Sequence, residues 1–168
     1  MTIHSPTIER HGDGFRLVYD EVYATGVDDL WEAITTRDRL ARWMADYTGD
    51  LREGGTWAVA TEGDEEPWAT GTIASCDAPR SFTTTWHATG EEPTELTVTL
   101  EEADGGARMR LVHTGIRSIF YGAGWQTYLE RLDAEARGEP IPQDWDARFA
   151  ELSPEYEKRF GNLWTERR

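Results

Sequence analysis

The sequence is poor in cysteine and in positive charge. Cys76 is the only cysteine among the 168 residues, which excludes an intrachain disulfide and a thiolate metal cluster and fits a reducing compartment. The 17 Lys and Arg residues are outnumbered by 32 Asp and Glu residues, which gives a formal net charge of -15. Because nucleic acids are bound mainly through cationic contacts to phosphate, we expect no nucleic-acid partner.

Long hydrophobic runs are absent as well. No stretch approaches the roughly 18 apolar residues of a membrane span, and the first residues, MTIHSP, contain neither a basic segment nor an apolar run. We therefore expect a soluble, unprocessed, cytoplasmic protein with no membrane partner. The acidity is most simply accounted for by solubility and self-repulsion rather than by recognition. A chain of this length can bury the core of a single domain.

Metal-binding and nucleotide-binding motifs are missing too. The four histidines, His4, His11, His87 and His113, are far apart, and there is no HExxH motif, so we expect neither a metal site nor a cofactor. The Gly122-Ala123-Gly124 segment lacks the third glycine and the βαβ context of a dinucleotide-binding loop. We interpret it as the close approach of a helix to a sheet.

Helical periodicity marks three segments of the chain. Apolar residues recur at intervals of three and four in Val27–Ile34 and in Arg37–Met44, which predicts two short amphipathic helices. A longer helix is predicted over Gly122–Arg137, where the apolar residues keep to one stripe and Gly138 ends the pattern. At about 1.5 Å per residue this helix is roughly 24 Å long, enough to cross one face of a sheet.

Strand patterns occupy most of the remaining chain. The six predicted strands are Phe15–Ala24, Thr56–Thr61, Trp68–Cys76, Ser81–Ala88, Thr94–Glu101 and Ala107–Thr114. Turn sequences such as Asp104-Gly105-Gly106 join them as antiparallel neighbours. We predict an α+β fold: a strongly curved six-stranded antiparallel sheet wraps around the long C-terminal helix, and the two short helices follow the first strand.

Six short motifs follow one another along this pattern. They are VDDLWEAI (27–34), LARWM (40–44), GGTW (54–57), APRSF (78–82) with Thr85-Trp86, LVHTG (111–115), and Gly124-Trp125 with Tyr128, Leu129 and Leu132. In this order they resemble the bacterial Hsp90-ATPase-activator-homologue-like proteins of the START, or Bet v 1-like, superfamily. The resemblance covers about Phe15 to Gly138. It implies a helix-grip fold that commonly encloses an apolar cavity, and no catalytic motif, because the family shares none.

The C-terminal residues depart from that family pattern. Members usually end near the long helix, whereas this chain continues over residues 139–168 with two sets of apolar residues at i, i+4 and i+7. We predict a helix-grip domain over residues 1–138 and an extension over 139–168. The extension is predicted to form two short amphipathic helices, the second capped by Ser153 with Pro154 at its first position. Three roles are open to it: docking on the domain's own surface, contact with a protein partner or a second copy in a homodimer, or a lid over the cavity.

Strand alternation predicts which side chains face the cavity. Arg108 and Arg110 mark the solvent-facing side of the last strand, so the opposite side, which ends in His113, points inward. Aromatic rings add apolar area and flat faces for a ligand. The predicted ligand-binding residues are Trp31, Trp57, Phe82, Thr84, Trp86, Val98, Met109, Leu111, His113, Trp125 and Tyr128. The same rings would also account for a filled core without a cavity.

Three functions are compatible with these features. The first is a small-molecule-binding protein that holds an apolar or aromatic ligand without catalysis. The second is an enzyme of the polyketide cyclase/aromatase or hydrolase kind, which the superfamily includes, with His113 as general acid/base and Asp46 or Tyr47 as its partner. The third is a co-chaperone-like interaction module that uses the acidic surface or the extension. An inward histidine can equally be a core residue hydrogen-bonded to a neighbour.

Overall fold

The computed structural model of the protein describes residues 3–60 and 63–165. Within these ranges the chain forms eight strands and five helices. The strands are β1 (Thr7–His11), β2 (Gly14–Tyr23), β3 (Asp46–Gly49), β4 (Thr56–Ala60), β5 (Ala69–Asp77), β6 (Ser81–Ala88), β7 (Thr94–Ala103) and β8 (Gly106–Ile116). The helices are α1 (Val27–Thr35), α2 (Arg37–Trp43), α3 (Phe120–Arg137), α4 (Trp145–Phe160) and α5 (Asn162–Thr165). None of the helices in these ranges is both long and apolar enough to cross a membrane.

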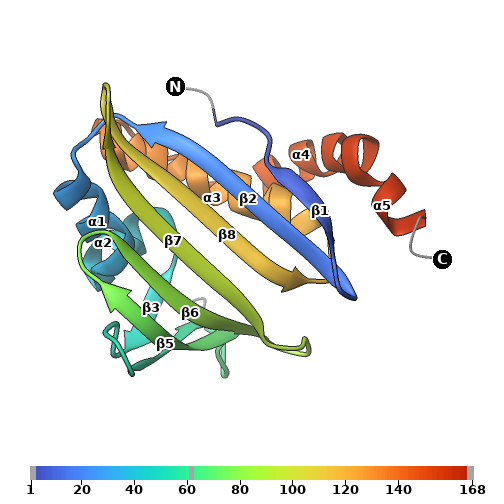
Figure 1. Ribbon diagram of the computed structural model, residues 1–168, viewed down its shortest axis with the longest axis horizontal. Helices are drawn as coiled ribbons and strands as arrows, with labels where there is room; N and C mark the ends of the chain where they lie inside the picture. The colour runs from blue at the N-terminus through green and yellow to red at the C-terminus, as the bar shows by residue number, and fades with distance from the viewer. Residues whose placement is uncertain (1–2, 61–62, 166–168) are drawn as a thin grey trace.

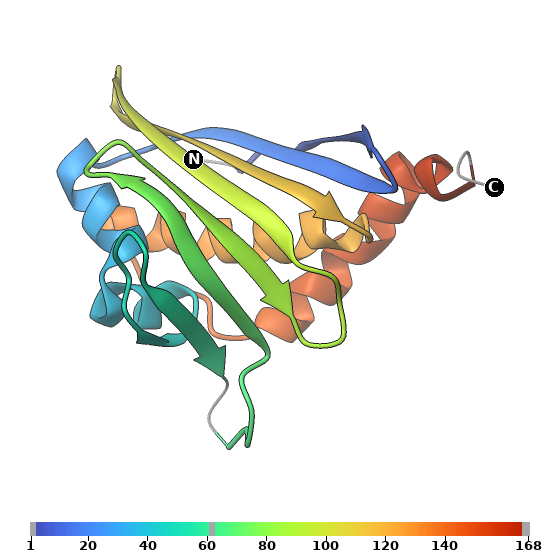
Figure 2. The same ribbon diagram turned by 60° about the horizontal axis from the view of Figure 1, so that its bottom comes forward.

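The strands form one curved antiparallel sheet with α3 along its concave face (Figure 1, Figure 2). Their order is β1-β2-β8-β7-β6-β5-β4-β3, so only the neighbours β2 and β8 are not consecutive in sequence. Helices α1 and α2 lie near the C-terminal end of α3, and α4 lies at its other end. This is the α+β architecture of a helix-grip fold, as predicted.

The predicted number of six strands is wrong, because β1 and β3 were missed. Each is a short strand at an edge of the sheet with only one buried side chain, Ile8 in β1 and Tyr47 in β3. A strand with a single buried residue has no alternation of polar and apolar residues to detect. The two short helices are present, but they follow the second strand, β2, rather than the first.

The core lies between the concave face of the sheet and the inner side of α3. Phe15 and Leu17 of β2 and Leu129 and Leu132 of α3 are fully buried there. Helix α3 ends where predicted, since Gly138 adopts a left-handed conformation with a φ of 68° that glycine takes up without steric cost.

The extension contains one long helix, α4, followed by the four-residue α5, which corrects the prediction of two short helices divided at Ser153. Ser153 and Pro154 lie inside α4, and the Ser153 hydroxyl donates to the Phe149 carbonyl across 2.8 Å instead of capping a new helix. Proline removes one backbone hydrogen bond from the helix. The helix continues because Leu152 and Tyr156, one residue from each predicted helix, are both buried, and burying them on one continuous face offsets that loss.

The extension docks on the protein's own surface, which was the first of the three roles considered. Arg148 of α4 donates to both carboxylate oxygens of Glu130 in α3, across 2.7 and 2.8 Å. The Tyr156 hydroxyl donates to Gln126 of α3 across 2.7 Å and also contacts the hydroxyl of Tyr19 in β2. These contacts tie α4 to α3 and to the sheet, while the division into residues 1–138 and 139–168 stays a prediction.

Candidate ligand-binding site

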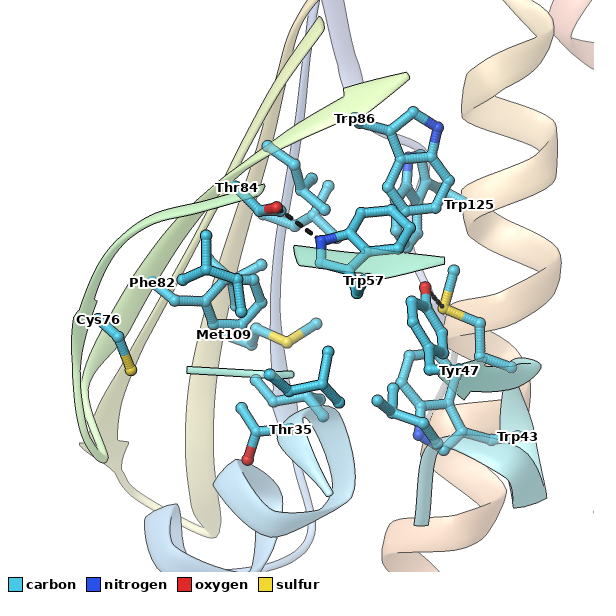
Figure 3. Close-up of a pocket in the computed structure, with 18 of the residues that line it drawn as sticks. Thr35, Trp43, Tyr47, Trp57, Cys76, Phe82, Thr84, Trp86, Met109 and Trp125 are labelled. Atoms are coloured by element: carbon cyan, nitrogen blue, oxygen red, sulfur yellow. Dashed lines mark hydrogen bonds between the residues drawn. The ribbon is translucent and has the colours of Figure 1, made fainter. Parts of the chain in front are cut away.

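An apolar cavity lies between the sheet and α3, and we call it the inner cavity (Figure 3). Its volume is about 80 Å³. Phe82 and Met109 reach into it from the sheet and face Trp43 and Tyr47 on the other side. An engineered apolar cavity of roughly 150 Å³ binds benzene. The inner cavity is smaller than that, because aromatic side chains occupy much of the space between the sheet and α3. They leave part of this space empty.

Eight of the eleven predicted ligand-binding residues line the inner cavity. They are Trp57, Phe82, Thr84, Trp86, Val98, Met109, Leu111 and Trp125. They come from four strands and α3, and strand alternation placed all the strand members on the correct face. Their role in ligand binding stays a prediction.

The other three predicted residues lie outside the inner cavity. Trp31 of α1 is half-buried and meets the ring of Phe82 edge to face, with ring centroids 6.0 Å apart. Tyr128 lines a different pocket, described below. His113 is fully buried beneath the lining and is not part of it.

Sequence reasoning also missed part of the lining. The lining residues absent from the predicted ligand-binding set are Ile34, Thr35, Leu40, Trp43, Met44, Tyr47, Leu51, Ile73, Cys76, Leu96 and Leu129. Most belong to α1, α2 and the segment around β3. The apolar stripe of α2 was visible in the sequence, but its orientation toward the cavity depends on how α2 packs against α3.

A row of aromatic rings forms one end of the inner cavity. Ring centroids lie 5.3 Å apart between Tyr47 and Trp57, 5.3 Å between Trp57 and Trp86, and 5.6 Å between Trp86 and Trp125. Gly71 makes room for this row, because a Cβ atom at that position would lie 2.4 Å from the Trp57 ring. Contacts at these distances stabilise aromatic pairs beyond their buried area.

The polar atoms of the lining are largely occupied by protein partners. Trp57 donates its Nε1 hydrogen to Thr84 Oγ1 across 2.8 Å, and Trp43 donates to the carbonyl of Ala33 across 2.8 Å. The Tyr47 hydroxyl donates to the sulfur of Met44 across 3.3 Å. Sulfur is a weak acceptor, so Tyr47 is the lining donor that a ligand can redirect most easily. Burial raises the pKa of Tyr47 above its usual value, which keeps the hydroxyl protonated.

His113 is a core histidine with both ring nitrogens engaged. Trp125 Nε1 donates to His113 Nδ1 across 3.0 Å, and His113 Nε2 lies 2.7 Å from the hydroxyl of Thr94. Thr94 in turn donates to the carbonyl of Trp86 across 2.9 Å. This order of donors assigns the proton to Nε2 of a neutral imidazole.

The environment of His113 opposes the acid/base role considered for it. Burial lowers its pKa to about 3, because a charged imidazolium would lose its hydration. The candidate partners Asp46 and Tyr47 are engaged elsewhere, Asp46 with Arg37 across 3.3 Å and Tyr47 with Met44. The His113 ring therefore holds Trp125 and Thr94 in place rather than facing a substrate.

A second, larger pocket opens between α3, α4 and the end of β6 with the turn that follows it, and we call it the outer pocket. Its volume is about 720 Å³. Met44, Trp86 and Trp125 line both pockets and so form the partition between them. The remaining wall includes Tyr128, Trp145 and other aromatic side chains. Nowhere in residues 3–60 and 63–165 do three His, Cys, Asp or Glu side chains gather to hold a metal ion.

Solved structures with this fold include a protein that matches this chain over nearly its whole length. CalU16 from Micromonospora echinospora is 27% identical in its crystal structure, with a TM-score of 0.75 over 97% of this chain and 98% of that one. Its solution structure gives 25% identity and a TM-score of 0.77 over 100% and 97%. Because the match spans nearly the whole chain, it includes most of the extension.

Two more distant structures share the fold alone. DynU16, a protein in the dynemicin biosynthetic locus, is 19% identical with a TM-score of 0.65, over 77% of this chain and 50% of that one. The Aha1 dimer from Colwellia psychrerythraea is 17% identical with a TM-score of 0.60, over 72% and 95%.

Among the curated proteins there is no match. The family model described as "Activator of Hsp90 ATPase homolog 1-like protein" matches residues 24–137, which is more than half of the chain and runs from the end of β2 to the end of α3. The chain therefore belongs to the Activator of Hsp90 ATPase homolog 1-like family.

Proposed function

We propose that the protein binds a small apolar or aromatic molecule in the inner cavity and does not transform it. The observation that carries this proposal is an almost wholly apolar lining around unfilled space, whose indole donors are already satisfied. Such a site favours a ligand through burial of apolar surface rather than through polar contacts. The location of DynU16 in a biosynthetic locus supports a role close to small-molecule chemistry.

Ligand entry requires the lining to adjust. The inner cavity of about 80 Å³ is smaller than the roughly 150 Å³ that accommodates benzene. Met44 and Met109 are the lining residues best suited to move, because an unbranched thioether side chain changes shape easily. Met44 also belongs to the partition, so its movement would open a path from the outer pocket.

Tyr47 is the proposed polar anchor of this site, in place of His113. Its hydroxyl is bonded only to the weak acceptor sulfur of Met44 in the hydrogen bonds of the described chain. A ligand acceptor that displaces this sulfur gains a stronger bond. A catalytic role for His113 has less support, because the ring is buried, neutral and engaged on both nitrogens.

Thermal denaturation with toluene as the probe tests the binding proposal. Ligand bound to the native state raises the melting temperature. Leu111→Phe fills the cavity and should abolish the shift, whereas Met109→Ala enlarges it and should increase the shift above that of the unsubstituted protein. Equal shifts in both variants would mean that toluene binds elsewhere, and no shift in Met109→Ala would contradict the proposal.

A further inference from the structure

Two residues that line the outer pocket each carry a buried donor that has no acceptor. The described residues include three buried side-chain polar atoms without a hydrogen-bond partner, and two of them, Arg131 Nε and Trp145 Nε1, belong to residues that line this pocket. Burying a donor without a partner costs free energy, and native proteins contain few such atoms. Two of them in one pocket indicate a missing acceptor.

The neighbouring arginines of α3 and α4 show what Arg131 lacks. Arg137 pairs with Asp133, and Arg148 pairs with Glu130. Arg131 forms neither an ion pair nor a hydrogen bond with any residue of the described chain, although the protein carries a net charge of -15. Burial lowers the pKa of Arg131, but a guanidinium remains charged at working pH. A positive charge is therefore available in the pocket.

The walls of the outer pocket suit a flat ring. Trp145 and Phe149 stack with ring centroids 4.9 Å apart, and Tyr128 lies 5.4 Å from Trp145. Trp86 and Trp125 close the floor toward the inner cavity. With about 720 Å³ of space, the pocket lies within the size range of sites that take drug-sized ligands.

The acidic groups of the pocket limit the charge of its ligand. Glu91 and Asp146 are exposed members of the wall, and Glu91 accepts a hydrogen bond from the Tyr121 hydroxyl across 2.8 Å. One guanidinium can pair with one carboxylate, whereas a phosphate group or a polyanion would be repelled more strongly by the two wall carboxylates. Among anionic ligands of Arg131, a monocarboxylate is therefore favoured over a phosphate or a polyanion.

We propose that the outer pocket binds an aromatic monocarboxylic acid, whose carboxylate accepts from Arg131 and from Trp145 Nε1 while its rings lie against the aromatic wall. The guanidinium fork matches a planar carboxylate, which is the reason that arginine is the usual partner of this group. This site goes beyond the inner cavity and does not require that the inner cavity bind anything.

Calorimetric titration of the full chain with two matched probes tests this site. The probes are 2-naphthoate and its neutral counterpart 2-naphthamide. We expect naphthoate to bind about tenfold or more tightly than naphthamide, because a hydrogen-bonded charge pair is worth about that factor. Arg131→Gln should remove this preference by weakening naphthoate alone, and Trp145→Phe should weaken naphthoate severalfold.

Matched variants distinguish binding in the outer pocket from binding elsewhere on the protein. Arg110→Gln makes the same charge change on the exposed face of β8 and should leave both affinities unchanged. Leu111→Phe, which fills the inner cavity, should also leave naphthoate binding unchanged. Equal affinity of the two probes, equal losses in Arg131→Gln and Arg110→Gln, or loss of naphthoate binding in Leu111→Phe would overturn the proposal, provided that thermal denaturation shows each variant to be folded.

Discussion

Trp125 donates its indole hydrogen to Nδ1 of the buried His113 across 3.0 Å, so the histidine fixes the ring that separates the two pockets. Trp125 lines both the inner cavity and the outer pocket. The opposite nitrogen of His113 lies against Thr94, which bonds the backbone of Trp86, the other aromatic member of the partition. One buried imidazole is thus linked to both aromatic members of the partition. This structural role accounts for a histidine at this position, and no catalytic role is needed.

Replacing His113 should destabilise the fold, because the role of this residue is structural. His113→Ala leaves the Trp125 indole and the Thr94 hydroxyl without their partner and creates a cavity, so we expect a loss of about 3 kcal/mol in the free energy of unfolding. His87→Ala, on the exposed face of β6, should cost less than about 0.5 kcal/mol. Urea denaturation measures both, and similar small losses would contradict the structural role.

The buried histidine should also make stability depend on pH. The pKa of His113 is about 3 in the folded protein and about 6.5 in an unfolded chain. Between these values the unfolded chain binds one more proton, so the free energy of unfolding falls as the pH falls. From pH 7.5 to pH 5 this loss should be about 2 kcal/mol. His113→Gln should lack this part of the pH dependence, and identical profiles for both proteins would refute the assignment.

Two glycines of α3 should respond oppositely to alanine. A Cβ atom at Gly122 would lie 2.5 Å from the ring of Tyr156, whereas one at Gly124 would meet only Trp145, at 3.7 Å. Alanine normally stabilises a helix by about 1 kcal/mol relative to glycine. Gly124→Ala should therefore stabilise the protein, and Gly122→Ala should destabilise it by displacing α4. Urea denaturation gives both signs, and stabilisation by Gly122→Ala would contradict the docking of the extension.

The Tyr47 hydroxyl should discriminate between ligands of similar size. Toluene has no acceptor, whereas benzonitrile presents one at the end of a similar ring. Tyr47→Phe should leave toluene binding unchanged and weaken benzonitrile about threefold to tenfold, the range expected for one hydrogen bond. Thermal shifts at several ligand concentrations provide the affinities. An equal loss for both ligands would show that the ring of Tyr47 matters and its hydroxyl does not.

The sequence predicted the parts of the site that lie on long, regular strands. Alternation along β8 placed Met109 and Leu111 inward because Arg108 and Arg110 mark the opposite face. It could not identify β3, where Tyr47 is the only buried residue. The partition could not be predicted either, since Met44, Trp86 and Trp125 come together from three different parts of the chain.

The C-terminal extension shows the same limit. The spacing of its apolar residues correctly predicts helical structure, but Pro154 predicts a break between two helices. The packing of Leu152 and Tyr156 keeps the helix continuous instead. The outer pocket was invisible for a related reason, because its lining joins α3 and α4 to the end of β6. Such a pocket exists only once the extension has docked.

A crystal structure of the protein grown with bromobenzene would show whether a small apolar molecule occupies the inner cavity. Anomalous scattering locates the bromine atom without reference to the protein density. We expect a bromine site bounded by Met109, Leu111 and Trp125, with Met44 or Met109 moved from its present position. Bromine found only in the outer pocket, or nowhere in the protein at saturating bromobenzene, would contradict this expectation.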